Sequence, residues 1–280
     1  MRLKNSPALR ILILFFCAAS SAPAQAFSET EFGLSPRDYA YLRKMIYQRE
    51  CGGKAENLVT WNEGEDFPSL GMGHFIWFTK DGPVPPYKEL FPDLLVYLEK
   101  HGQEIPPWIK KLQDRKAPWG TREEFMRDQE SPRVYSLRSF MTRTVRLQTA
   151  FIASRINKLL PKILRRVPAV ERKGVRDKFI SLAHTREGLF ALIDYTHFKG
   201  DGLHETERYA GEGWGLLQVL EEMRAPAEGS TPLEEFVRAA QTVLRRRVYN
   251  SPPRRNESRW LAGWENRVMG YAPSAKIKGK

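Results

Sequence analysis

A glutamate at the end of a predicted helix is the residue of this chain best suited to acid catalysis. Glu50 continues, at helical spacing, the apolar stripe that contains Leu42 and Ile46. Because such a stripe faces the protein interior, we expect the Glu50 carboxyl to be partly desolvated, which raises its pKa. A carboxylic acid that keeps its proton near neutral pH can protonate a leaving group. The sequence therefore makes Glu50 the candidate general acid.

A second carboxylate could come from the acidic turn that follows Glu50. Glu63, Glu65 and Asp66 lie between two β-favouring segments, and Glu63 stands six residues before Ser69. The Ser69 hydroxyl could hold a water molecule, which a nearby carboxylate could then activate. Cleavage of a glycosidic bond needs a protonated carboxyl and a base or charge stabiliser. Glu63, Glu65 and Asp66 are therefore all candidates for the second carboxylate.

Capping residues and hydrophobic spacing predict the elements that must position these groups. Ser35 opens a predicted helix that ends before Gly52, and residues 58–61 and 67–78 predict a short β-hairpin around the acidic turn. Pro161 is expected to kink or split a later helix. The downstream helices are predicted at about 90–100, 106–112, just after Thr121, 131–144, 148–167, 173–183, 189–198, 214–223 and 231–249.

These elements predict an α+β fold that is mainly α, with a small β-hairpin lobe and a helical lobe. We expect one domain over residues 27–280, because the sequence contains no repeat, low-complexity tract or linker. Residues 79–130 are rich in Pro and Trp, and we interpret them as an insertion that lengthens or covers a cleft. The run at 189–198 is apolar nearly all round, which is typical of a central buried helix.

The first 26 residues have the pattern of a signal peptide. Arg2, Lys4 and Arg10 form a basic region, an apolar run at 11–19 follows, and Ala24-Gln25-Ala26 is a small-x-small cleavage site. We therefore expect cleavage after Ala26 and a periplasmic or secreted protein. The apolar run is too short to span a bilayer, and no later segment predicts a membrane span.

Removal of this segment would leave a basic chain with one cysteine. The formal charge would be +12 − 3 = +9, because residues 1–26 contain three basic and no acidic residues. Such a charge suits an anionic partner such as a cell-wall polymer. No nucleic-acid partner is expected, because the motifs of nucleic-acid-binding modules are absent. Cys51 alone cannot form an internal disulfide, and we expect it to be a small buried residue of a monomeric protein.

The segment from Glu50 through Glu63 to Ser69-Leu70-Gly71-Met72-Gly73-His74 resembles the phage-type lysozymes of the lysozyme-like superfamily. That family places a Glu at the end of its first helix, an Asp in a β-hairpin, a Thr six positions later, and a Gly-x-Gly-His turn. On this resemblance Glu50 takes the general-acid position, Glu63 the Asp position and Ser69 the Thr position. Here Glu replaces Asp, Ser replaces Thr, and the gap after Glu50 is wider.

The resemblance also implies roles for the surrounding residues. Trp61, Gly71 and Gly73 are expected at the substrate, with the glycines serving the backbone geometry of the turn. His74 is expected to be structural and paired with an acid. The later string Gly213-Trp214-Gly215-Leu216-Leu217-Gln218 is similar to the Gly-Leu-Met-Gln string of goose-type lysozymes and lytic transglycosylases, and we expect it to line the cleft.

The expected activity is cleavage of the β-1,4 glycosidic bond of peptidoglycan or a related polysaccharide, with no cofactor and no metal. His197, His204, Glu205 and Glu207 match no standard metal-ligand spacing. Two alternatives stay open. The first is a lytic transglycosylase or chitinase-like hydrolase on the same fold. The second is a non-catalytic cell-wall-binding protein, which the altered second-carboxylate region motivates.

Overall fold

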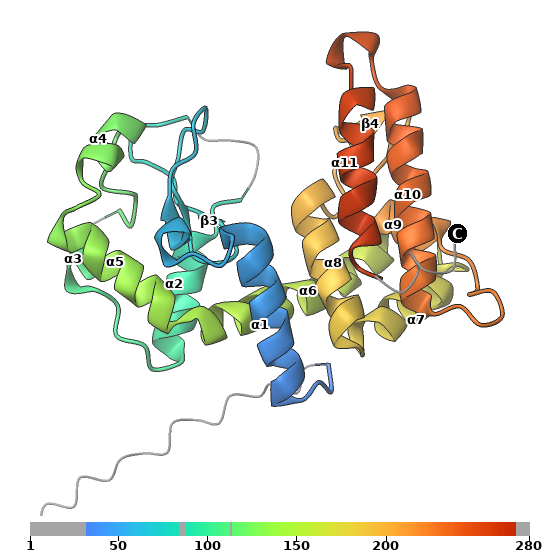
Figure 1. The fold of residues 1–280 in the computed structure, drawn as a ribbon, viewed down its shortest axis with the longest axis horizontal. Coiled ribbons are helices and arrows are strands. Elements are labelled where there is room, and N and C mark those ends of the chain that lie inside the picture. Colours follow the sequence, from blue (N-terminus) through green and yellow to red (C-terminus); the bar gives the residue numbers. More distant parts are fainter. Residues whose placement is uncertain (1–31, 84–87, 113, 273–280) are drawn as a thin grey trace, which may run out of the picture.

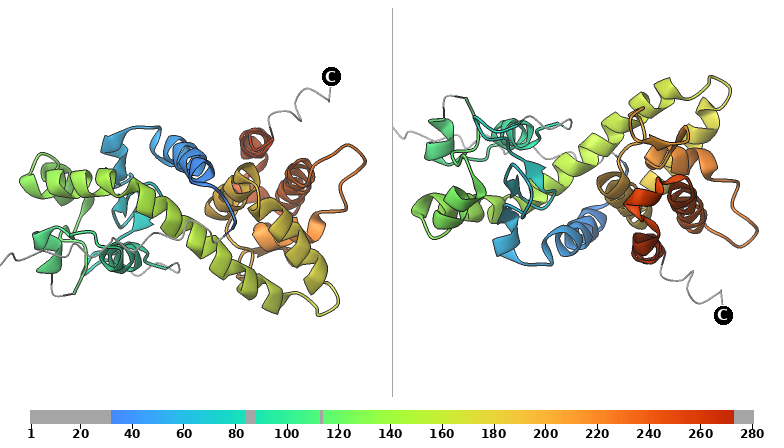
Figure 2. Two further views of the ribbon diagram at one scale, coloured as in Figure 1. Left: turned by 90° about the horizontal axis from the view of Figure 1, so that it is seen from below. Right: turned by 90° about the horizontal axis from the view of Figure 1, so that it is seen from above.

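The chain is mainly helical and carries two small antiparallel sheets, as the α+β prediction requires. The computed structural model describes residues 32–83, 88–112 and 114–272, so the predicted signal peptide at 1–26 lies outside the described residues. Figure 1 shows one group of elements around β1–β3 and α2–α5 and another formed by α7–α11, which we call the N-terminal and C-terminal lobes. Figure 2 shows the long helix α6 running from one lobe to the other.

The bounds of the elements agree with most of the predicted ranges to within a few residues. The helices are α1 (Pro36–Cys51), α2 (Phe91–Lys100), α3 (Pro107–Lys110), α4 (Arg122–Arg127), α5 (Pro132–Arg143), α6 (Val145–Arg166), α7 (Arg172–Ala183), α8 (Arg186–Lys199), α9 (Leu216–Glu222), α10 (Pro232–Asn250) and α11 (Ser258–Met269), with two 3-10 turns, η1 (Ala55–Leu58) and η2 (Pro253–Arg255). The strands are β1 (Val59–Thr60), β2 (Ser69–Leu70), β3 (Phe75–Ile76), β4 (Arg208–Tyr209) and β5 (Glu212–Gly213).

Helix α1 begins and ends at the residues that its sequence predicts. The Ser35 side chain accepts a hydrogen bond from the Asp38 backbone, the Asp38 carboxylate accepts one from the Ser35 backbone, and Pro36 occupies the first turn. Gly52 ends the helix in the left-handed conformation, at φ 59°. Leu42 and Ile46 are buried on the stripe that leads to Glu50. The local sequence therefore fixes where the candidate acid lies.

The predicted hairpin is present and is joined by a third short strand. Thr60 pairs with Ser69 across β1 and β2, and Ser69 pairs with Ile76 across β2 and β3, both antiparallel. The tight turn between β2 and β3 contains Gly71 at φ +69° and His74 at φ +45°. A left-handed backbone cannot continue a strand, so this turn divides the β-favouring segment 67–78 into two strands.

The segment interpreted as an insertion supplies much of the core of the N-terminal lobe. The Trp77 ring packs against Phe91 at 4.7 Å and edge-on against Trp119 at 6.1 Å, and the Trp119 ring meets Phe125 edge-on at 4.9 Å. Trp77 also donates from its indole N–H to the backbone carbonyl of Arg115, at 2.7 Å. Aromatic side chains with their N–H groups satisfied stabilise such a core. Residues 79–130 thus pack against the small sheet.

Helices α6 and α8 pack against each other and against α7. Helix α6 continues through Pro161 without splitting, and Leu159 and Ile163 are buried on either side of the proline. Helix α8 is buried nearly all round, as its composition predicts, and it packs on both α1 and α7. Within the described residues, no helix combines the length and the apolar character that crossing a lipid bilayer requires.

Candidate active site

Glu50 lies at the end of α1, where side chains of both lobes meet. Its carboxylate accepts a hydrogen bond from Arg267 Nη2 of α11 at 3.3 Å, and His74 Nδ1 lies 3.9 Å from its other oxygen. The Glu50 side chain is 17% exposed, so the predicted partial burial is confirmed. His74 was also predicted to pair with an acid, and that acid is Glu50. The carboxyl thus combines limited solvent access with a basic side chain on each side.

Asp194 is the centre of the charged network behind Glu50. This carboxylate is 2% exposed and accepts two hydrogen bonds from Arg267, from Nε at 2.9 Å and from Nη2 at 2.7 Å. Arg49 Nε lies 3.5 Å away, and the Tyr271 hydroxyl donates a further hydrogen bond. A buried charge needs such partners because desolvation is costly. Asp194 is not among the predicted site residues, although an acid within the apolar run 189–198 is a signal that could have identified it.

The charge of Asp194 changes the pKa values of its partners. Burial and the neighbouring Asp194 carboxylate together raise the pKa of the Tyr271 hydroxyl well above its usual value. Burial alone would lower the pKa of Arg267, but hydrogen bonds to Asp194 and its charge raise it overall. Arg267 is therefore a permanent cation, and its guanidinium contacts the carboxylates of both Asp194 and Glu50.

The glycine turn that carries His74 is fastened to α6 by a buried glutamine. Gln148 accepts from the Met72 backbone N–H at 2.9 Å and donates to the Met141 carbonyl at 2.7 Å. A Cβ on Gly71 would lie 2.5 Å from the Gln148 oxygen, and one on Gly73 would lie 2.7 Å from the Phe75 ring. Both glycines therefore permit close packing, and Gly71 also permits the left-handed backbone of the turn. No sequence pattern points to Gln148, because its role depends on contacts between distant segments.

His197 and Arg155 belong to the electrostatic surroundings of Glu50. Desolvation lowers the pKa of His197, while the Glu50 charge acts in the opposite direction. The pKa of the partly exposed Arg155 is lowered by desolvation too. The charges of Glu50, Arg155, Asp194 and His74 all act on His197, so these side chains from α1, α6, α8 and the glycine turn lie near one another.

The other residues expected at the site lie along the small sheet and its acidic turn. Glu63 is exposed in the turn between β1 and β2, and Ser69 is buried in β2. In the same turn, Glu65 accepts from Asn62 Nδ2 at 3.2 Å, and its backbone carbonyl accepts from the Trp61 indole at 2.7 Å. These bonds hold the turn together internally. Glu63 extends from it into solvent.

Trp61 is a core residue. It is 5% exposed, and its ring packs on Phe125 at 5.9 Å. Its carbonyl accepts from Arg122 Nε at 2.9 Å, which ties β1 to α4. Because the Trp61 ring is buried, it offers no open face for the predicted contact with substrate. Burial against the segment 79–130, which the sequence pattern did not reveal, accounts for this placement.

The glycine-rich string at 213–218 lines a cavity in the C-terminal lobe. It contributes Gly213, Leu217 and Gln218 to a cavity of about 240 Å³, whose wall also includes Arg166 and Glu221. The Gln218 side chain accepts from the Gly215 N–H at 3.0 Å and donates to the Gly202 carbonyl at 3.2 Å, so it organises the loop before α9. The walls of this cavity do not include Glu50, so the expectation that the string lines the cleft of Glu50 stays a prediction.

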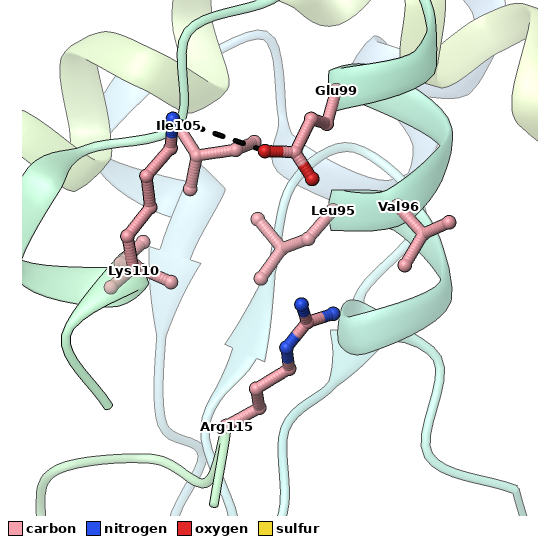
Figure 3. Close-up of a pocket in the computed structure, with 7 residues that line it drawn as sticks. Leu95, Val96, Glu99, Ile105, Lys110 and Arg115 are labelled. Carbon is pink, nitrogen blue, oxygen red and sulfur yellow. Dashed lines mark ion pairs between the residues drawn. The ribbon is translucent and has the colours of Figure 1, made fainter. Parts of the chain in front are cut away.

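A second cavity lies between α2 and α3 in the N-terminal lobe. Figure 3 shows Leu95 and Ile105 beside the ion pair between Lys110 and Glu99, whose charged atoms are 3.8 Å apart, with Arg115 below them. Its volume is about 110 Å³, and none of the side chains that contact Glu50 lines it. It therefore plays no part in the site around Glu50.

Neither the lone cysteine nor the His- and Glu-rich loop supplies a reactive centre in the described residues. Cys51 is buried, and desolvation together with the nearby Glu50 charge raises its pKa to about 12. In the loop before α9, Glu205 pairs with Arg166 at 3.3 Å. The described part of the chain contains no group of three or more His, Cys, Asp or Glu side chains arranged to hold a metal ion.

No protein-family model, curated protein or solved structure matches this chain. The nature of the site must therefore be inferred from its own chemistry. A half-buried carboxyl is surrounded by imidazole and guanidinium groups that come from α6, α8, α11 and the glycine turn. Such a set can bind an anionic, hydroxyl-rich molecule and transfer a proton to it.

Proposed function

We propose that the protein is an exported glycosidase with a lysozyme-like fold, which cleaves the β-1,4 glycosidic bond of peptidoglycan or a related polysaccharide. One observation carries the proposal. Glu50, at the end of α1, lies against His74 of the glycine turn, and the charges of Glu50, His74 and Arg155 all act on His197. An acid with limited solvent access therefore lies among basic side chains that could hold an anionic polysaccharide.

Glu50 acts as the general acid in this proposal. Its proton passes to the bridging oxygen as the bond from that oxygen to the anomeric carbon breaks, and the leaving sugar departs as an alcohol. The carboxylate that remains on Glu50 accepts a hydrogen bond from Arg267 Nη2, which stabilises its new negative charge. Arg267 is therefore a positioning residue, held in place by Asp194.

Attack on the anomeric carbon completes the reaction in one of two ways. In the hydrolase, water adds to this carbon and loses its proton to the second carboxylate, for which Glu63 is the candidate and Glu65 and Asp66 are alternatives. In a lytic transglycosylase, the sugar's own 6-hydroxyl attacks, and Glu50 then suffices as both acid and base. The exposure of Glu63 in its turn motivates keeping the transglycosylase as an alternative within the same class.

A second candidate function is non-catalytic binding to the cell wall. The ion pair between Glu50 and Arg267 favours it, because Arg267 also joins α8 to α11 through Asp194. In this function the Glu50 carboxylate serves the contact between helices, and the basic side chains around it bind anionic polymer without cleaving it.

Digestion of purified peptidoglycan tests the two functions. We expect the wild-type protein to release muropeptides and Glu50→Gln to release none. Glu56→Gln is the matched control, because Glu56 is an exposed glutamate just beyond α1. Mass spectrometry distinguishes reducing ends, made by a hydrolase, from anhydro ends, made by a transglycosylase. Loss of hydrolysis in Glu63→Gln would assign the second carboxylate.

Two results would contradict the glycosidase. If wild-type protein sediments with peptidoglycan and releases nothing, the binding function replaces it. If Glu50→Gln releases as much product as Glu56→Gln, Glu50 is not the acid.

A further inference from the structure

An aromatic stripe on α11 begins beside Glu50 and runs away from it. Trp260, Trp264 and Arg267 follow one another at spacings of four and three residues, so they share one face of the helix. Arg267 at one end contacts Glu50, and Trp260 lies about 10 Å further along the helix axis, at 1.5 Å per residue. The stripe therefore connects the candidate acid to a surface well beyond the bond that would be cleaved.

The rings along this stripe touch one another without a break. The Arg267 guanidinium lies 4.6 Å from the centre of the Phe198 ring, and Phe198 meets Trp264 edge-on at 6.4 Å. Trp264 and Trp260 are 6.0 Å apart with their planes inclined by only 30°. Trp260 is 41% exposed, and it is the most exposed of the seven tryptophans. An exposed, oriented indole is apolar surface that folding leaves available to a ligand.

Two basic side chains accompany these rings. Arg259 stands 4.3 Å from the centre of the Trp260 ring, and Lys199 Nζ stands 3.2 Å from the centre of the Trp264 ring. Lys199 is buried, whereas Arg259 is exposed and has no ion-pair partner among the described residues. The acids closest to Arg259 along the chain, Glu257 and Glu265, are already paired with arginines. Arg259 therefore supplies the accessible positive charge of the stripe.

We infer that Trp260 and Arg259 form a remote binding subsite for a glycan strand that bears carboxylates, reached from Glu50 along Phe198 and Trp264. The C–H face of a pyranose ring is apolar and can cover the Trp260 indole, which removes apolar surface from water. Arg259 then donates to a carboxylate on the same strand. That the bound strand is peptidoglycan or a related polysaccharide rests on the proposed function. The surface around Trp260 and Arg259 should prefer acidic glycans over neutral ones.

Binding experiments in a Glu50→Gln background test the subsite without cleavage of the polymer. Co-sedimentation with insoluble peptidoglycan should show affinity weakened on the order of tenfold by Trp260→Ala, which is about 1.4 kcal/mol. Trp260→Phe retains a flat ring and should restore most of the binding. Tyr249→Ala is the matched control, because Tyr249 is 89% exposed and lies outside the stripe.

The charge preference has its own test. Arg259→Gln should weaken binding to peptidoglycan, reduce its dependence on salt, and leave binding to uncharged chitin unchanged. Equal binding of the Trp260→Ala and Tyr249→Ala proteins would overturn the subsite. An equal effect of Arg259→Gln on peptidoglycan and chitin would overturn the preference for acidic glycans.

Cleavage assays with Glu50 intact keep this inference separate from the proposed function. If wild-type protein releases muropeptides while Trp260→Ala binds normally, only the subsite fails. If Trp260→Ala loses binding but wild-type protein releases nothing, the glycosidase fails and the subsite stands as part of a binding protein.

Discussion

The Arg267 guanidinium contacts two carboxylates at once, Asp194 through two hydrogen bonds and Glu50 through one at 3.3 Å. Asp194 belongs to α8, Glu50 ends α1 and Arg267 lies in the last turns of α11. One side chain therefore couples the stability of the helical lobe to the geometry of the candidate acid. A substitution of Arg267 should therefore change both the stability of this lobe and the position of the Glu50 carboxyl.

We predict that Arg267→Met destabilises the protein by about 3–5 kcal/mol, the usual loss when a buried charge loses its partner. Asp194 would keep only Arg49 and Tyr271 as neighbours. Urea unfolding measures the change. Arg245→Met is the control, since its ion pair with Glu265 involves a mostly exposed guanidinium and should contribute less than about 1 kcal/mol.

The same network predicts strong coupling between Arg267 and Asp194. Asp194→Asn in the Arg267→Met protein should recover part of the lost stability, because it removes a buried charge that has lost its main partner. Additive losses in the double variant would show that the two side chains act independently, contrary to the network described above.

Gly71→Ala should destabilise the protein more than Gly102→Ala. Both glycines have positive φ, at +69° and +74°, so alanine is strained at either position. A Cβ at Gly102 would meet no atom within 4 Å, whereas one at Gly71 would lie 2.5 Å from Gln148 Oε1 and displace it from the Met72 N–H. Thermal unfolding should show an additional loss of about 1–3 kcal/mol at Gly71. Equal losses would mean that the Gln148 contact does not constrain the turn.

Lys199→Met should stabilise the protein most at and below neutral pH. Burial, together with the charges of Arg247 and Arg267, lowers the pKa of Lys199 from 10.5 to about 7, although Glu257 opposes this. Between these two values the unfolded chain binds more protons than the folded one, so wild-type stability rises with pH across this window. The cation–π contacts with Trp264 and Phe198 favour the charged amine and limit the gain to a few kcal/mol.

Urea unfolding of both proteins from pH 6 to pH 10 measures this difference. The advantage of Lys199→Met should shrink steadily as the pH rises above about 7. A constant difference over the whole range would contradict the lowered pKa.

Cys51 should react with alkylating reagents only when the protein unfolds. The thiolate is the reactive species, and a pKa of about 12 leaves almost none of it at pH 8. Mass spectrometry of the Cys51 peptide should show alkylation slowed on the order of a hundredfold or more relative to the protein in denaturant. The double variant Cys51→Ser, Lys54→Cys supplies an exposed reference thiol and should react rapidly when folded. Rapid alkylation of folded Cys51 would contradict its burial.

The sequence alone determined the local structure around the candidate acid. The capping box of Ser35 and Asp38, the apolar stripe of α1 and the left-handed Gly52 are interactions between residues close together in the chain, and they fix Glu50 at a helix end. The buried character of α8 and the capped start of α10 follow from spacing in the same way. Short-range patterns decide these features because the partners are only three or four residues apart.

Only the tertiary structure decided what surrounds that acid. Arg267 follows Glu50 by 217 residues, Gln148 reaches the glycine turn across 76 residues, and Trp61 becomes a core residue through packing against Phe125. No local pattern encodes these contacts, because the separation along the chain carries no information about which distant surfaces pack together. The sequence thus determined where the carboxyl lies, and long-range packing determined which charged side chains surround it.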